Sequence, residues 1–142
     1  MLLIWQSEQP TKRKNMKILL VEDDETVREM TELFLTNLGH KVVMADSKHS
    51  ACHMIQEQVK ELELILTDND LPTLDEGLEV IDFAQRATRL CRDTDIYFVL
   101  MSGRDKWFEA EEAGAVFLPK PFDLIGVATA IQAATEKELV AA

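Results

Sequence analysis

The chain has 142 residues, enough for one globular domain and too few for two full domains with a linker. Hydrophobic residues make up 46% and charged residues 29%, so the composition excludes a mainly disordered protein. Acidic residues outnumber basic ones by 26 to 15, which gives a formal net charge of −11 at pH 7. This charge would repel a nucleic-acid backbone, so we expect no direct binding to nucleic acid.

The sequence carries no feature of a secreted or membrane-bound protein. Cys52 and Cys91 lie inside periodic segments without C-x-x-C spacing, which is typical of thiols in a reducing compartment. No apolar run approaches the length of a membrane span, and the apolar start at residues 1–5 is too short for a signal peptide. We therefore expect a cytoplasmic protein that makes no contact with a membrane.

From Lys17 onward, short apolar runs alternate with segments whose apolar residues recur at helical spacing. The runs are continuous, as expected of strands buried on both faces, and polar residues follow them. Residues 1–15, which precede this region, are expected to form a flexible leader. In chain order, the predicted strands and helices occupy residues 18–21, 27–38, 42–45, 51–59, 64–67, 78–87, 96–101, 107–110, 115–118 and 124–131.

Five strand–helix units in succession predict an α/β fold. Right-handed crossovers would place helices on both faces of a doubly wound, five-stranded parallel sheet. Asp24 or Glu25 is a candidate cap for the first helix, and Gly39 stands where a glycine commonly ends one.

Polar residues gather where the predicted strands end. They are Asp23 and Asp24, then Asp68, then Ser102, then Lys120. In open parallel sheets, ligands bind beyond the carboxyl ends of the strands. Three carboxylates at one edge would repel one another unless a cation lay among them, which favours a divalent ion with oxygen ligands, Mg²⁺. A simpler interpretation of the acidic pair is a capped helix start, and of Asp68 a turn residue.

Five motifs together resemble the receiver domains of bacterial two-component response regulators, over residues 17–137. The motifs, in the family's order, are Val21-Glu22-Asp23-Asp24, Leu-Thr-Asp68-Asn-Asp-Leu-Pro72, Ser102-Gly103, Ala113-Gly114-Ala115 and Lys120-Pro121-Phe122. The resemblance implies a flavodoxin-like (βα)5 receiver fold. It also implies domain bounds of 16–138, with a short tail at 139–142.

The same resemblance implies a phosphorylation site. Asp68 would be the phosphoacceptor, whose carboxylate attacks a phosphohistidine. Asp24, Asp68 and the backbone carbonyl of Asp70 would ligate Mg²⁺, with Asp23 acting directly or through a water. Lys120 would pair with a phosphoryl oxygen.

Three further residues would connect the site to a switch. Ser102 would donate its hydroxyl to a phosphoryl oxygen, and Phe117 would turn inward with it, although Phe117 could equally be a fixed core residue. The Lys120–Pro121 peptide bond is expected to be cis. Phosphorylation would change the surface formed by residues 107–110, 115–118 and 124–131.

The implied partners follow from this role. A histidine kinase or a histidine phosphotransfer protein would donate the phosphoryl group, and a downstream effector protein would bind the switched surface. The chain would be a monomer or a phosphorylation-linked dimer. It would accept the group and slowly lose it, without turning over a substrate as an enzyme does.

The sequence departs from the family in two segments. Asp75-Glu76-Gly77 contains an extra residue, and the segment between Ser102 and Lys120 is shortened, which predicts a short or irregular helix there. Asp70 and Arg104 occupy two variable positions that in the family influence the lifetime of the phosphoryl group. An acidic Asp70 is expected to make the pocket more negative.

Two other functions compete with phosphoacceptance. Asp68-Asn69-Asp70 fits the Asp-x-Asp nucleophile motif of haloacid-dehalogenase-like phosphatases. Against this, Pro72 replaces the usual Thr, and the acidic pair precedes the nucleophile instead of following it. The third hypothesis is a degenerate receiver that works as an unphosphorylated docking domain.

Overall fold

A computed structural model describes residues 15–91 and 94–141, with side chains in the last helix described as far as Glu136. Five parallel strands form one sheet in the order β2-β1-β3-β4-β5. The bounds of the strands are β1 (Lys17–Val21), β2 (Lys41–Ala45), β3 (Leu64–Asp68), β4 (Tyr97–Ser102) and β5 (Val116–Pro119). The helices are α2 (Glu25–Asn37), α3 (Lys48–Gln58), α4 (Glu76–Leu90), α5 (Trp107–Glu112) and α6 (Leu124–Ala141).

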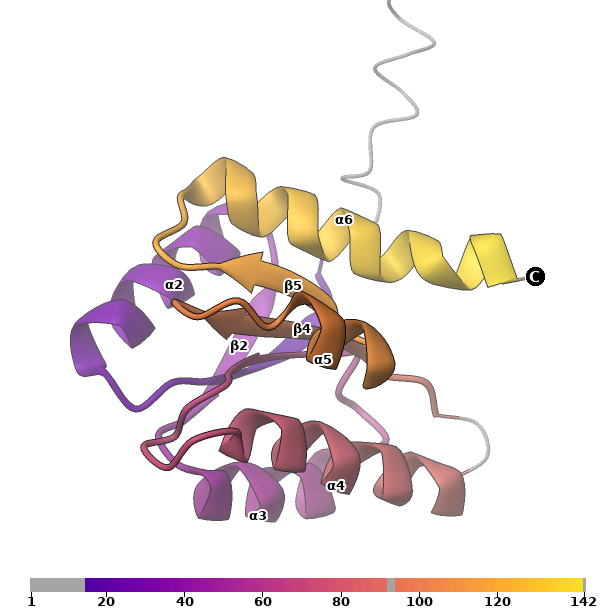
Figure 1. Cartoon of the computed structure of the whole chain (residues 1–142). Helices are drawn as coiled ribbons and strands as arrows, with labels where there is room; N and C mark the ends of the chain where they lie inside the picture. The colour runs from indigo at the N-terminus through magenta and orange to yellow at the C-terminus, as the bar shows by residue number, and fades with distance from the viewer. Residues whose placement is uncertain (1–14, 92–93, 142) are drawn as a thin grey trace, which may run out of the picture.

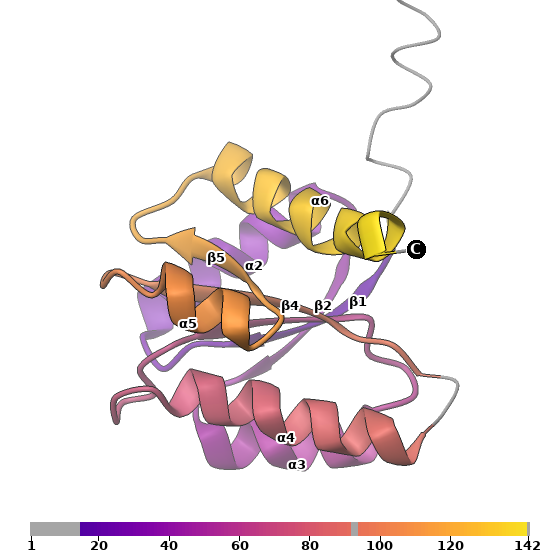
Figure 2. The same cartoon turned by 45° about the vertical axis from the view of Figure 1, so that its right-hand side comes forward.

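Helices cover both faces of the sheet. Helices α3 and α4 lie together on one face, and α2 and α6 on the other (Figures 1 and 2). Alternate residues of each strand enter two separate apolar clusters, so that Leu19 and Ile65 face α3 and α4, while Leu20 and Leu66 face α2 and α6. The doubly wound parallel fold predicted from the sequence is confirmed.

The element boundaries differ from the prediction in ways that have physical causes. Strand β5 continues through Pro119, which an edge strand tolerates because its outer side has no ladder partner. Helix α6 continues through Ala141 and so includes most of the predicted tail, in a segment rich in the strong helix former alanine. Helix α5 has only six residues, as the shortened sequence predicts.

Two further expectations from the sequence concern the leader at residues 1–15 and the absence of a membrane span. Residues 1–14 of the predicted leader lie outside the described residues. Within the described ranges, the structure contains no helix that is both long and apolar enough to cross a membrane.

Gly77 fixes the start of α4 against the end of β3. A Cβ at this position would lie 2.0 Å from the carbonyl oxygen of Asp68 and 2.7 Å from the Cα of Asn69. The Gly77 N–H also donates to the Asn69 carbonyl oxygen at 2.7 Å. Only a glycine allows this approach, which holds the backbone of Asp68 in place.

We predict that Gly77→Ala destabilises the protein by more than about 2 kcal/mol, because the added methyl group overlaps backbone atoms that cannot move independently. Urea denaturation measures the change. The control is Gly103→Ala, since a Cβ at Gly103 meets no atom within 4 Å. That variant should stay within about 0.5 kcal/mol of the parent chain. Equal stability of the two variants would contradict the steric argument.

Candidate functional site

The carboxyl edge of the sheet brings charged side chains from distant parts of the sequence together. Glu22 and Asp23 follow β1, Asp68 ends β3, and Lys120 follows β5. The Lys120 ammonium nitrogen lies 2.8 Å from Glu22 Oε1 and 3.2 Å from Asp68 Oδ2. One cation therefore contacts two carboxylates, and the Lys120–Pro121 peptide bond that follows it is cis.

Burial strengthens these interactions. The Glu22 side chain is fully buried and that of Asp68 is 9% exposed. Burial raises the pKa of Glu22 to about 7; the hydrogen bond from Lys120 opposes this shift and the charge of Asp68 adds to it. Burial alone would lower the pKa of Lys120, but the bond to Glu22 and the charge of Asp68 outweigh it and raise that pKa. The lysine is thereby held in its charged form.

The same edge has the ligand set of a hard divalent cation. Glu22, Asp23 and Asp68 each offer a carboxylate oxygen, and these oxygens lie within 4.8 Å of one another. Asp23 is exposed, so the group opens to solvent. Clustered carboxylate oxygens are the donors that Mg²⁺ prefers, and the residues present therefore fit this ion.

Asp24 lies outside this group of three carboxylates. Its Oδ1 accepts a hydrogen bond from the Val27 N–H at 2.9 Å, and Asp24 is the N-cap of α2. Glu22 supplies the third carboxylate of the group. The Glu22 N–H donates a hydrogen bond to the Ala45 carbonyl oxygen at 3.1 Å. This bond to β2 holds Glu22 at the edge of the sheet.

Ser102 ends β4 and Phe117 lies within the neighbouring strand β5, and both residues are buried. The Ser102 hydroxyl oxygen accepts a hydrogen bond from the Arg104 N–H at 3.0 Å. The Phe117 ring packs edge-on against the half-exposed Trp107, with ring centroids 4.7 Å apart and planes at 65°. Phe117 therefore occupies a buried position beneath an aromatic ring that the sequence analysis did not connect with it.

Asp70 contributes less negative charge to the site than its sequence position suggests. The Arg104 guanidinium contacts both of its carboxylate oxygens, with Nη2–Oδ1 at 2.9 Å and Nε–Oδ2 at 3.2 Å. Partial burial acts to raise the pKa of Asp70, but the hydrogen bonds from Arg104 and from the Asp75 N–H hold it below its usual range. The expectation of a more negative pocket is thus corrected, since Arg104 compensates this carboxylate.

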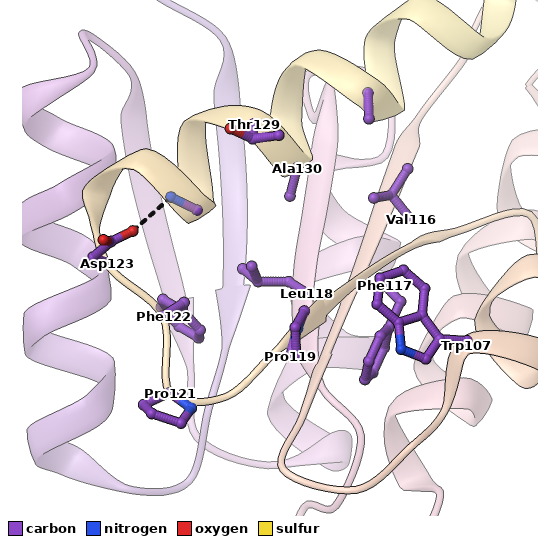
Figure 3. A pocket seen from close by; sticks show the side chains of 12 residues that line it. Trp107, Val116, Phe117, Leu118, Pro119, Pro121, Phe122, Asp123, Thr129 and Ala130 are labelled. Carbon is purple, nitrogen blue, oxygen red and sulfur yellow. Dashed lines mark hydrogen bonds between the residues drawn. The ribbon is translucent and has the colours of Figure 1, made fainter.

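An apolar groove of about 690 Å³ lies beside the site, between α5, β5 and α6. Figure 3 shows Trp107 and Phe117 at one end of it and Phe122 with Asp123 at the other. The side chains of Leu118 and Ala130 lie between them. Because α5 is short, this groove is bordered on one side mainly by the Trp107 ring.

Comparison with known proteins identifies the family. The family model of the response regulator receiver domain matches residues 18–132. The response regulator receiver protein CpdR of Brucella abortus is 34% identical over 128 residues, which covers 89% of this chain and 98% of CpdR. The transcriptional regulatory protein AfsQ1 of Streptomyces coelicolor is 36% identical over 107 residues, which covers 70% of this chain. The chain spans 46% of the length of AfsQ1, and only 14% of the rice regulator-like protein PRR73.

Solved structures of receiver domains share the fold of this chain. A response regulator receiver domain protein from Clostridium thermocellum matches with a TM-score of 0.74 at 21% identity, covering 89% of this chain and 99% of that one. The receiver domain of the hybrid histidine kinase CckA matches with a TM-score of 0.67 at 25% identity, covering 83% of this chain and 97% of that one. With the family match over most of its length, the chain belongs to the response regulator receiver domain family of two-component systems.

Proposed function

We propose that this chain accepts a phosphoryl group on Asp68 from the phosphohistidine of a histidine kinase or histidine phosphotransfer protein, in the presence of Mg²⁺. The observation that carries the proposal is the contact of Lys120 with Asp68 and Glu22 beside the exposed Asp23. The likeness to the receiver domain of a hybrid histidine kinase supports this class of donor. The two described thiols are free, in keeping with a cytoplasmic protein.

The chemistry is one displacement at phosphorus. An Asp68 carboxylate oxygen forms the new P–O bond while the P–N bond to the donor imidazole breaks, and the imidazole leaves with the electron pair. Lys120, already 3.2 Å from Asp68 Oδ2, stabilises the negative charge on the transferred group. The product is an acyl phosphate formed once per encounter with the donor, not by turnover of a free substrate.

We further propose which residues hold the metal. The carboxylates of Asp23 and Asp68 and the backbone carbonyl of Asp70 are its ligands, and Glu22 acts beside them through its contact with Lys120. When bound, Mg²⁺ would neutralise charge on the phosphoryl oxygens and reduce the repulsion among the carboxylates.

The proposed consequence of phosphorylation is a change in the binding of partner proteins. The phosphoryl group adds negative charge and acceptor oxygens at the edge of the sheet, where the Ser102 hydroxyl lies. We propose that Ser102 turns towards this group and that Phe117 moves with it. Because Phe117 lines the groove between α5, β5 and α6, its movement would alter the surface presented to an effector protein or to a second copy of the chain.

Incubation with acetyl phosphate and Mg²⁺ should add one phosphoryl group to the chain, because Asp68 is the nucleophile. Intact mass spectrometry measures the adduct, and an acyl phosphate is released by hydroxylamine. Asp68→Asn should show none. Asp82→Asn is the matched control, since Asp82 is an exposed aspartate on α4 paired with Arg86, and it should be modified as the parent is. An adduct that persists in Asp68→Asn would contradict the assignment.

Mg²⁺ should raise the stability of the parent chain, by about 2.7 kcal/mol at 100 times its Kd, because it binds the folded site and relieves repulsion. Thermal denaturation with and without the metal measures this. Asp23→Asn should lose most of the Mg²⁺ effect because it removes a ligand.

Substitution of Asp24 distinguishes its role as the N-cap of α2 from a role as a metal ligand. Asp24→Asn should keep the Mg²⁺ effect and the stability, because asparagine caps a helix as well as aspartate does. Asp24→Ala should keep the Mg²⁺ effect but lose about 1 kcal/mol of stability with the cap. Loss of the metal effect in Asp24→Asn would support Asp24 as a ligand, as predicted from the sequence, and contradict the proposed ligand set.

A further inference from the structure

The two segments in which the sequence departs from its family meet in space. Asp75 lies in the loop with the extra residue, and Lys106 is the residue from which the shortened α5 begins. The Asp75 Oδ1 atom is 3.1 Å from Lys106 Nζ and 3.5 Å from Arg104 Nη2. Arg104 in turn binds Asp70 through two hydrogen bonds. We call Asp70, Asp75, Arg104 and Lys106 the ion-pair bridge.

The ion-pair bridge differs from an ordinary surface salt bridge because one of its side chains is buried and several donors share one carboxylate oxygen. The Lys106 side chain is only 11% exposed. Asp75 has a left-handed backbone, with φ of 65°, which costs free energy in any residue with a Cβ. The Asn69 amide also donates to Asp75 Oδ1 at 3.0 Å, so three donors converge on one carboxylate oxygen. These contacts offset the unfavourable backbone and the burial of the lysine.

The ion-pair bridge joins the loop after the phosphoacceptor to the segment that carries the switch residues. The Arg104 N–H is bonded to the Ser102 hydroxyl oxygen. Lys106 is followed directly by Trp107, whose ring lies on Phe117 (Figure 3). A movement of Ser102 and Phe117 towards a phosphorylated Asp68 would therefore shift Arg104 and Lys106 relative to Asp70 and Asp75.

We propose that the ion-pair bridge holds α5 and Trp107 in place over Phe117 in the unphosphorylated chain and so opposes the switch. The proposal rests on the function proposed above. In physical terms, the bridge stabilises the unphosphorylated arrangement and not the switched one. Removing it should therefore favour the switched arrangement and any ligand that selects it.

The test is the affinity for beryllofluoride, a stand-in for the phosphoryl group, in the presence of Mg²⁺. The chain has two tryptophans, so all variants carry Trp5→Phe and the fluorescence reports Trp107. Asp75→Asn removes the charge but keeps a residue that tolerates a left-handed backbone. Lys106→Met keeps the apolar stem of the buried lysine. Lys48→Met is the matched control, because Lys48 pairs with Glu79 across α3 and α4, away from the site.

Each bridge variant should bind beryllofluoride about fivefold more tightly than the parent. The double variant should gain little more, because both substitutions remove the same contact. Lys48→Met should bind as the parent does. Unchanged or weaker binding in Asp75→Asn would overturn the inference, and that variant carries the test if Lys106→Met fails to fold. Failure of the parent to bind beryllofluoride would instead overturn the proposed function.

Discussion

The central constraint on this structure is the repulsion between two carboxylates, those of Glu22 and Asp68, which the parallel sheet brings close together. Glu22 follows β1 and Asp68 ends the adjacent strand β3. Both residues are buried, so water screens little of the repulsion between their carboxylates. Lys120 contacts both of them, and its own position is set by the strand at the far edge of the sheet. The contacts of the site therefore require β1, β3 and β5 in their places in the folded sheet.

The two sides of the site differ in how firmly they are held. On the side of α4, Gly77 packs directly against the backbone of Asp68, and no intervening side chain can rearrange. On the side of α5, the contacts are ion pairs and one aromatic pair, which have alternative geometries. In the proposed mechanism, this asymmetry would keep the Asp68 carboxylate fixed while the neighbouring surface changes.

Much of the fold could be predicted from the sequence because continuous apolar runs identify strands buried on both faces. Asp68, Ser102 and Lys120 could be placed at the carboxyl edge of the sheet for the same reason, since each stands at or just after the end of such a run. The contact of Glu22 with Lys120 could not be predicted in this way. It depends on the register of β1, in which Val21 pairs with Ala45 and Thr67, and the register is set by partners far away in the sequence. The ion pair between Asp75 and Lys106 could not be predicted from the sequence either, because each residue belongs to a loop whose path is defined only in the folded chain.

The small size of α5 has a consequence for the energetics of signalling. Its six residues bury a single side chain, that of Ala110, so little apolar surface anchors the helix to the sheet. Regions with few buried contacts open locally at a small fraction of the free energy needed to unfold the whole domain. A longer helix with more buried side chains would resist such opening. In the proposed mechanism, one phosphoryl group would therefore need to move only a short segment, and the sheet would keep its stability.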